Sequence, residues 1–366
     1  MFSKKTKNSF YINVKLPEQI QEIIIGSNLQ KWIFKEISSR NYSRLIVFID
    51  VNFANLYADW LLQLKNTLAP NDIIFVEASE KSKSLEFLNS ALEKCFNANI
   101  NRKSCIIAVG GGIVGDIAGF FASVYMRGID FIFIPTTLMA QADTIINKVA
   151  ISYKMLKNIV GSFYSPVLTI CDIDFLQTLP KSEISLGLSE IIKHAFIESP
   201  FFVKYLENTL RANLMGWKKY PWKKIIYKSL LIKSKIVEKD PLDKNEIHKG
   251  LSYGHTFANA LEGLSDFKFR HGESVSLGMC ASALAGLDLG ILSEKEIRRQ
   301  KELLQRVGLP IKFPGTLNKE EIIDLMSKDK ICTDCGLSIV ILEKIGKFKI
   351  CKNINLEIIK SVLSAI

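Results

Sequence analysis

Short apolar runs alternate with amphipathic stretches along the first half of the chain. The apolar runs are rich in β-branched and aromatic residues, and polar or turn-forming residues bound them. These runs predict buried strands at residues 44–50, 73–76, 105–109, 131–134 and 167–171. Between the strands, apolar residues at helical spacing predict helices such as 84–96 and 113–125. Continuous apolar strands that alternate with helices are typical of a parallel sheet covered on both faces, so we expect an α/β domain with a Rossmann-like sheet.

The pattern changes after Pro180, where helical spacing becomes dominant. It predicts helices at residues 181–212, 222–239, 253–264, 271–290, 293–307, 319–328 and 354–364. In this half only residues 337–342, LSIVIL, have a β-like pattern. We therefore predict two domains, an α/β domain of residues 1–179 and a mainly α-helical domain of residues 180–366. A chain of 366 residues is long enough to form both cores.

The net charge of +11 is carried mostly by lysines that are spread through the helical segments. Nucleic-acid surfaces are typically denser in basic residues and interleave them with aromatic ones, so we expect no nucleic-acid partner but some attraction for anionic small molecules. The chain has no apolar run of about 18 residues, and its first residues, MFSKKTKNSFYI, lack the apolar core of a signal peptide. We therefore expect a cytoplasmic protein with no membrane partner.

A glycine run, IIAVGGGIVGD at residues 106–116, joins a predicted strand to a predicted helix. Its Gly110, Gly112 and Gly115 fit the pattern G-x-G-x-x-G. Glycine lets the backbone approach a ligand, and the free N–H groups at a helix start attract phosphate. The pattern alone also fits an ordinary turn, but its position between strand and helix favours phosphate binding. Ligands of parallel sheets bind beyond the carboxyl ends of the strands. Other polar candidates near such ends are Asp50, Asn52, Thr136 and Thr137.

The four histidines of the chain all lie between residues 194 and 271. Two of them, His255 and His271, precede segments with helical spacing, and Glu190 lies inside another. Two imidazoles and a carboxylate are a typical Zn²⁺ set that leaves positions open for substrate. Taken alone, each residue is more often a core, capping or solvated group. Two histidines at helix starts would face a shared cleft, so the combination favours a metal site.

Seven segments resemble, in order and spacing, the 3-dehydroquinate synthase family, the sugar phosphate cyclases. They are GGGIVGDIAGFFASVYMRG, PTTLMAQAD, KNIVGSFYSP, FLQTLP, LSEIIKHA, YGHTFANALE and HGESVSLGM. The resemblance covers the whole chain and implies a dehydroquinate synthase-like fold, with an NAD-binding first domain and a second domain that binds metal and substrate. It also implies a carbon–oxygen lyase that depends on NAD and a divalent metal, Zn²⁺ or Co²⁺, and acts on a phosphorylated sugar. In that family a substrate hydroxyl is transiently oxidised, phosphate is eliminated, the ketone is reduced again, and an aldol reaction closes a carbocycle.

The resemblance also implies roles for individual residues. Those that match cofactor positions are Asp50, Asn52, Glu80, Lys83, Gly111, Gly112, Asp116, Thr136, Thr137, Phe175, Thr178, Leu179 and Glu183. Those that match the metal ligands are Glu190, His255 and His271. Those that match catalytic positions are Asp143, Lys148, Lys193 and Lys233. Those that match substrate-binding positions are Arg127, Lys157, Asn158, His248, Ser252, Asn259 and Lys330. Because Arg127 matches an arginine that a neighbouring subunit contributes, the resemblance implies a homodimer.

The departures from the family pattern concentrate on the substrate positions. The run ADTIINK, which ends at Lys148, lacks two glycines of the family pattern and is one residue shorter. His248 and Ser252 stand where the family has arginine and asparagine, Asn259 replaces a histidine, and Ile331 replaces a lysine. Loss of a charge-assisted arginine contact with a carboxylate would cost about 1.5–3 kcal/mol unless a protonated His248 replaces it.

Several functions therefore stay open. We favour the shikimate-pathway reaction of 3-dehydroquinate synthases. The first alternative is a cyclase of an uncarboxylated sugar phosphate, such as sedoheptulose 7-phosphate or glucose 6-phosphate. A metal-dependent polyol dehydrogenase is disfavoured, because a simple alcohol needs no phosphate-binding lysines. The last alternative is an inactive NAD-binding remnant.

Overall fold

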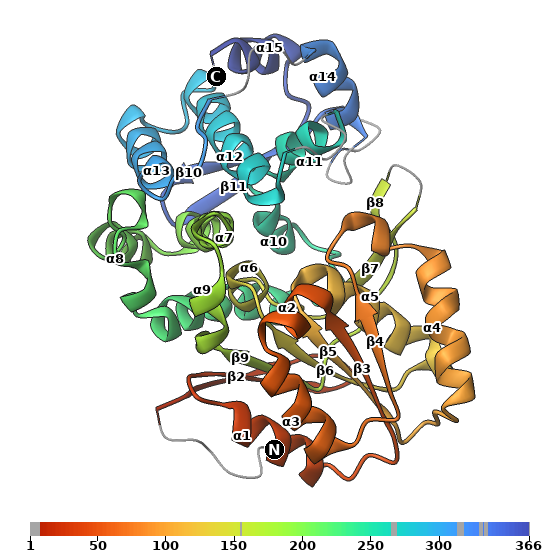
Figure 1. The fold of residues 1–366 in the computed structure, drawn as a ribbon. Coiled ribbons are helices and arrows are strands. Elements are labelled where there is room, and N and C mark those ends of the chain that lie inside the picture. The colour runs from red at the N-terminus through yellow and green to blue at the C-terminus, as the bar shows by residue number, and fades with distance from the viewer. Residues whose placement is uncertain are drawn as a thin grey trace. The chain divides into compact units, whose positions relative to one another are not determined.

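The computed structural model describes residues 8–153, 156–264, 269–312, 318–328, 332 and 336–365 (Figure 1). The chain forms two compact units. The first contains Met1–Leu179 and Trp222–Ser234, and the second contains Pro180–Pro221 and Lys235–Ile366. Among the described residues, no helix combines the length and the apolar character needed to cross a membrane.

A seven-stranded sheet forms the centre of the first unit. Its strands are, in spatial order, β1 (Phe10–Lys15), β2 (Ile20–Gly26), β9 (Leu168–Asp172), β6 (Asp130–Pro135), β5 (Cys105–Gly110), β3 (Leu45–Asp50) and β4 (Asp72–Val76). Six of them are parallel, and β1 pairs antiparallel with β2 at one edge. Every residue of β3 and β5 is buried, because helices cover both faces of the sheet.

Alternate residues of the strands pack into two separate cores. Val47 and Ile49 pack on one face with α1 (Gln30–Ser39), α2 (Val51–Leu56) and α3 (Ala58–Leu68). Ile46 and Phe48 pack on the other face with α4 (Leu85–Asn97), α5 (Gly112–Val124) and the hairpin of β7 (Val149–Tyr153) and β8 (Leu156–Ser162) (Figure 1). The connections that follow the neighbouring strands β3 and β5 thus lie on opposite faces. The carboxyl ends of these two strands form the switch point where such sheets bind ligands.

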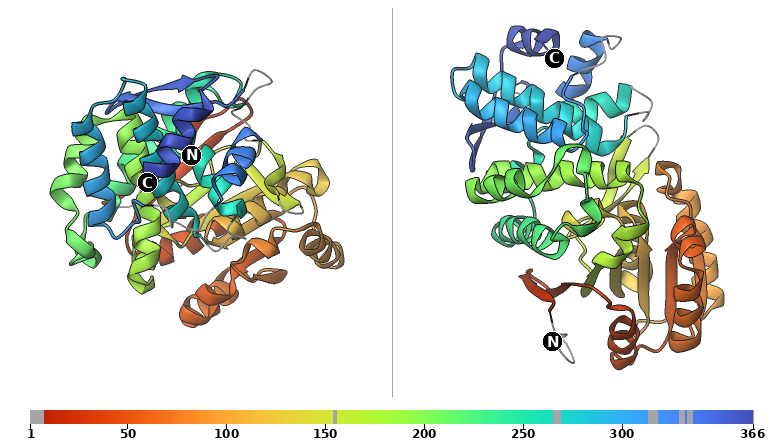
Figure 2. Two further views of the ribbon diagram at one scale, coloured as in Figure 1. Left: turned by 90° about the horizontal axis from the view of Figure 1, so that it is seen from above. Right: turned by 60° about the vertical axis from the view of Figure 1, so that its left-hand side comes forward.

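Helices dominate the second unit. They are α7 (Lys181–Glu198), α8 (Pro200–Thr209), α10 (Glu246–Lys249), α11 (His255–Leu264), α12 (His271–Asp288), α13 (Glu294–Arg306), α14 (Lys319–Ser327) and α15 (Leu356–Ala365). The antiparallel hairpin of β10 (Ile339–Lys344) and β11 (Lys347–Cys351) lies at their side (Figure 2). Phe257 of α11, Leu277 of α12 and Ile341 of β10 belong to one apolar core. Helix α9 (Trp222–Lys239) is divided between the two units.

The predicted fold class is confirmed. The five predicted strands and the two named helices of the first half agree with the structure to within one residue at each end. The sequence pattern missed β1, β2, β7, β8 and β11. In β11, KFKIC, exposed and half-buried residues follow one another, and no continuous apolar run marks the strand.

Candidate functional site

The glycine run lies at the switch point of the sheet. Asp50 ends β3, and its carboxylate accepts a hydrogen bond from the N–H of Phe53 at 3.0 Å, which caps α2. Gly111 precedes the first residue of α5, Gly112. The N–H of Thr136 donates to the carbonyl of Gly110 at 3.0 Å and thereby joins the ends of β5 and β6. The structure therefore brings these predicted cofactor residues to one edge of the sheet.

Gly112 and Gly115 of this run differ in the space around their Cα atoms. Apart from its chain neighbours and the backbone of its own helix, a Cβ atom on Gly112 would meet no atom of the described residues within 4 Å. A Cβ atom on Gly115 would lie 2.7 Å from Phe133 and from Ile145, so Gly115 allows α5 to pack closely on the sheet. The open space at Gly112, beside the free N–H groups of the helix start, fits the diphosphate of a dinucleotide.

Aromatic packing holds the segment that follows β9 beside the end of β3. Phe175 lies in the 3₁₀ helix Ile173–Thr178 and packs edge-on against Phe53, with ring centroids 5.0 Å apart. The hydroxyls of Thr178 and Tyr57 lie 3.0 Å apart. Phe175 is itself a buried core residue, and Leu179 directly follows this segment. Asn52 is exposed on α2.

A network around the buried Lys83 joins α5 to the β7–β8 hairpin. Its Nζ lies 2.8 Å from Oδ2 of Asp116 and 3.9 Å from Oε1 of Glu80, and it contacts Oδ1 of Asn158. Ser152 of β7 donates to Oε1 of Glu80 at 2.7 Å. Burial raises the pKa of Asp116 even though Lys83 acts in the opposite direction. Residues predicted for the cofactor and for the substrate therefore belong to one connected group.

The predicted catalytic residues Asp143 and Lys233 form an ion pair, with Nζ 2.8 Å from Oδ1. Lys233 also donates to the carbonyls of Asp143 and Thr144 at 3.0 and 2.8 Å. Ser229 donates to the carbonyl of Ala142 at 3.0 Å. These contacts attach the first part of α9 to the segment after helix α6 (Leu138–Ala142), which is why Trp222–Ser234 belongs to the first unit.

The remaining predicted catalytic and substrate residues of the first unit are Lys148, Lys157 and Arg127. Nζ of Lys148 lies 5.9 Å from the centroid of the Phe163 ring. Lys157 is half-buried and precedes Asn158 on β8. Arg127 is exposed, and both it and Met126 have a positive φ, +67° and +52°.

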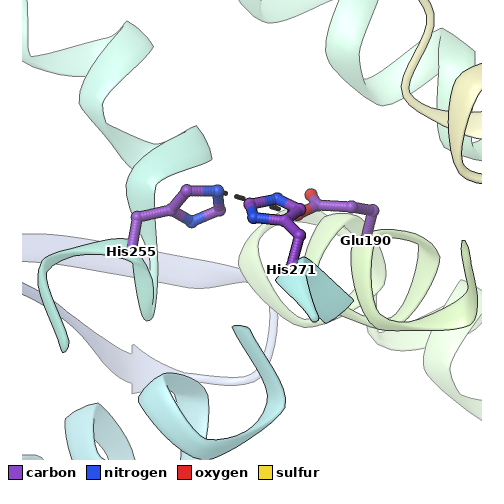
Figure 3. A group of neighbouring side chains, drawn as sticks. All are labelled: Glu190, His255 and His271. Carbon is purple, nitrogen blue, oxygen red and sulfur yellow. Dashed lines mark ion pairs between the residues drawn. The ribbon is translucent and has the colours of Figure 1, made fainter. Parts of the chain in front are cut away.

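Three helices of the second unit bring Glu190, His255 and His271 together (Figure 3). Glu190 is buried on α7, whereas His255 and His271 are the first residues of α11 and α12, so both histidines lie at helix starts, as predicted, although the helix predicted from residue 253 begins two residues later. The Nε2 atoms of His255 and His271 lie 3.6 and 3.4 Å from Oε1 of Glu190. One ligand atom from each residue lies within 4.8 Å of the other two, so the three side chains can share one cation.

The surroundings of these side chains fit a divalent cation. Nδ1 of His255 faces the carbonyl of Tyr253 at 3.3 Å, and Nδ1 of His271 faces Oε1 of Glu262 at 2.8 Å. Each ring therefore directs Nε2 toward Glu190. Both carboxylate oxygens of Glu190 are buried, and neither accepts a hydrogen bond of ordinary geometry from the described residues. Oε2 forms an ion pair with the Lys193 ammonium, and a cation would satisfy Oε1, which faces the two imidazoles.

Burial and the neighbouring charges shift the pKa of every titratable side chain in this cluster of Glu190, His255 and His271. Burial and the Lys193 ammonium lower the pKa of His255 to about 3. Burial also acts to lower the pKa of His271, but the carboxylates of Glu190 and Glu262 raise it to about 10. Lys193 and the two histidines hold the pKa of Glu190 well below its usual range against the effect of burial. The carboxylates of Glu190 and Glu262 thus place negative charge on both sides of the His271 ring, which a cation at Nε2 would balance.

The other predicted residues of the second unit lie at different places. Lys193 is buried one helical turn after Glu190 and forms an ion pair with it. Glu183 pairs with Arg270. His248 is buried on α10, with Nδ1 2.9 Å from the carbonyl of Asp240. Ser252 is half-buried after α10 and Asn259 is exposed on α11, while Lys330 lies outside the described residues.

Sequence reasoning missed two features of the cluster. Glu262, which contacts His271, lies seven residues after His255 and therefore on the same face of α11, so helical spacing could have indicated it. The second feature is a backbone contact, since a Cβ atom on Gly278 of α12 would lie 2.0 Å from the carbonyl oxygen of Gly254. Gly254, with φ at +81°, directly precedes His255. The two glycines thus fix the start of α11 against α12.

Comparison with known families assigns both units. The 3-dehydroquinate synthase N-terminal model matches residues 73–186, and the C-terminal model of the same family matches residues 187–331. The chain belongs to the 3-dehydroquinate synthase family. One member, the 3-dehydroquinate synthase of Desulforamulus reducens, is 35% identical over 361 residues, which cover 96% of this chain and 99% of that relative. The family resemblance inferred from the seven segments is therefore confirmed.

Solved structures of other cyclases have the same fold as this member of the 3-dehydroquinate synthase family. A 2-deoxy-scyllo-inosose synthase complexed with carbaglucose-6-phosphate, NAD⁺ and Co²⁺ superimposes with a TM-score of 0.86 at 23% identity, covering 97% of this chain and 99% of that one. A 2-epi-5-epi-valiolone synthase from Streptomyces hygroscopicus with NAD⁺ and Zn²⁺ bound gives 0.86 at 21% identity, with coverage of 96% and 98%. At these identities the comparison establishes the shared fold.

Proposed function

We propose that the protein is a cytoplasmic 3-dehydroquinate synthase, an NAD- and metal-dependent lyase that eliminates phosphate from a phosphorylated sugar acid and closes a carbocycle. The observation that carries this proposal is the convergence of Glu190, His255 and His271 on one point of the second unit. The full-length similarity to a 3-dehydroquinate synthase supports the choice of substrate.

Different residues of the chain would bind NAD, the metal and the substrate in this reaction. The start of α5 at Gly111 and Gly112, together with Asp50, would hold NAD, and Glu190, His255 and His271 would hold Zn²⁺ or Co²⁺. When bound, NAD supplies reversible hydride acceptance and the metal polarises the hydroxyl that is oxidised. The lysines would bind the anionic substrate as point charges. They are Lys148, Lys157, Lys193 and Lys233.

A second candidate is a cyclase of an uncarboxylated sugar phosphate, and the setting of His248 favours it. One ring nitrogen of His248 faces the carbonyl of Asp240 at 2.9 Å, and a nitrogen of His248 lies within 4.8 Å of the carboxylates of Asp240 and Asp243. Nearby carboxylates disfavour the approach of a substrate carboxylate. A substrate without that group would avoid the repulsion.

We also propose that the protein is a homodimer in which Arg127 enters the phosphate site of the partner subunit. Arg127 is exposed, and the apolar side chains of Val124 and Met126 beside it are 49% and 45% exposed. Exposed apolar groups beside a functional arginine are typical of an interface. Sedimentation equilibrium should give twice the chain mass of 41.3 kDa. A monomer at every concentration would contradict the proposal.

Phosphate release tests the proposed reaction. Purified protein with NAD⁺ and Co²⁺ or Zn²⁺ would be given the seven-carbon acid phosphate of the shikimate route, sedoheptulose 7-phosphate or glucose 6-phosphate in separate assays. We expect release from the acid phosphate, without net formation of NADH because the hydride returns to the product.

Release only from one of the uncarboxylated sugars would select the second candidate. Net NADH formation with an unphosphorylated polyol would identify a dehydrogenase. Release from none of the three substrates, together with retained NAD binding, would identify an inactive remnant.

A further inference from the structure

Glu262 places a buried carboxylate directly against a candidate metal ligand. It lies on α11 with 2% of its surface exposed, and its Oε1 is 2.8 Å from Nδ1 of His271 on α12. Removing a carboxylate from water costs several kcal/mol unless it is paired and hydrogen-bonded. The hydrogen bond with His271 therefore offsets part of the free-energy cost of burying Glu262. It also connects Glu262 to the cluster of Glu190, His255 and His271.

The contact with Glu262 determines the orientation and the tautomer of the His271 ring. Nδ1 donates its proton to the Glu262 carboxylate, so the opposite nitrogen, Nε2, points toward Glu190, whose Oε1 is 3.4 Å away. A ring held in this way offers the lone pair of Nε2 to a cation in a fixed direction. Without the carboxylate the ring can rotate or adopt the other tautomer.

The Nδ1 atoms of His255 and His271 face different hydrogen-bond acceptors. His255 has the neutral carbonyl of Tyr253 at 3.3 Å from Nδ1, whereas His271 has a carboxylate at the shorter distance of 2.8 Å. Hydrogen bonds to ionised acceptors are about twice as strong as those between neutral groups. The carboxylate also increases the basicity of the ring, so His271 is the better fixed and stronger donor of the pair.

We infer that Glu262 is a positioning residue of the metal centre, which acts through His271 and does not itself touch the cation. The inference rests on the proposed function only in that Glu190, His255 and His271 bind a divalent metal. It assigns Glu262 a role in metal affinity and geometry in addition to its part in packing α11 against α12.

Metal titration of two variants tests the inference without turnover. Glu262→Gln keeps an oxygen that can accept the Nδ1 proton but removes the charge, and Glu262→Ala removes both. We expect Co²⁺ affinity to fall about 10–100-fold in Glu262→Ala, with Glu262→Gln between it and the wild type. The visible absorption of bound Co²⁺ should change in Glu262→Ala, because the geometry at His271 changes.

A matched control separates this role from general stability. Glu207→Gln removes a carboxylate that forms two hydrogen bonds with Arg299 in the same unit, at 2.8 and 3.0 Å, and should leave Co²⁺ affinity and absorption unchanged. Wild-type affinity and an unchanged Co²⁺ spectrum in both Glu262 variants would overturn the inference. If Glu262→Ala does not fold, Glu262→Gln decides in the same way. Failure of the wild type to bind Co²⁺ would instead remove the metal site on which the proposed function depends.

Discussion

Replacing Glu190 with glutamine should remove bound metal and abolish turnover. Glu190 supplies the carboxylate of the cluster, and an amide is a much weaker cation ligand than a carboxylate. We expect a larger loss of affinity than the roughly 10–100-fold typical for residues outside the ligand shell. The variant should also unfold more easily by about 3–5 kcal/mol, because the buried Lys193 loses the carboxylate with which it forms an ion pair. Elemental analysis and thermal unfolding measure the two effects.

A double variant separates the two effects. Glu190→Gln combined with Lys193→Met leaves no unpaired buried charge at this pair, so it should recover most of the stability but none of the metal binding. Stoichiometric metal in either variant would show that Glu190 is not a ligand.

Replacing Gly112 with valine should remove NAD binding while the fold remains intact. Beyond its own turn of helix, none of the described residues has an atom within 4 Å of a Cβ at this position, and Gly112 does not have a positive φ. The valine side chain would instead fill the space that the diphosphate needs at the start of α5. We expect NAD⁺ affinity to fall at least about 100-fold, equivalent to ~2.8 kcal/mol, with an unchanged melting temperature. Calorimetric titration with NAD⁺ and thermal unfolding provide the measurements.

Gly115→Ala is the matched control on the same helix. Its Cβ would lie 2.7 Å from Phe133 and from Ile145, so it should cost about 1–3 kcal/mol of stability. NAD⁺ affinity should change far less than in Gly112→Val. Wild-type NAD⁺ affinity in Gly112→Val would show that the cofactor does not use this loop.

The sequence predicts those elements whose hydrophobic pattern is complete in itself. Strand β3, LIVFID, is buried at every position, so an unbroken apolar run indicates it directly. Strand β8, LKNIVGS, contains lysine, asparagine and glycine and is stabilised by its pairing with β7, which no local pattern reveals. Similarly, the first part of α9 belongs to the first unit through Ser229 and Lys233, whose acceptors lie at residues 142–144. Contacts between residues so far apart in sequence leave no periodic signal.

In the candidate site, too, some residues can be predicted from the sequence and others depend on contacts between distant parts of the chain. His255 and His271 are two of only four histidines and both precede helical segments, so the sequence itself marks them, whereas Glu190 lies inside a helix and is matched to a ligand by the family resemblance. Glu262 resembles any other helical glutamate until its burial and its contact with His271 are known. The predicted substrate residues belong to both units, Lys157 and Asn158 to the first and His248 to the second, so no local sequence pattern groups them.

The contact between Gly254 and Gly278 has a consequence for how this reaction centre tolerates change. The backbone contact between Gly254 and Gly278 fixes the position of His255, and the backbone carbonyl of Tyr253 orients its ring, so neither depends on the side chains of its chain neighbours. His248 and Ser252 precede the contact, and Asn259 is exposed beyond it. Side chains at these three positions can therefore be exchanged while the imidazole of His255 stays in place. If these three residues bind substrate, as the family resemblance implies, selection can alter the preference for one sugar over another there without changing the proposed metal centre.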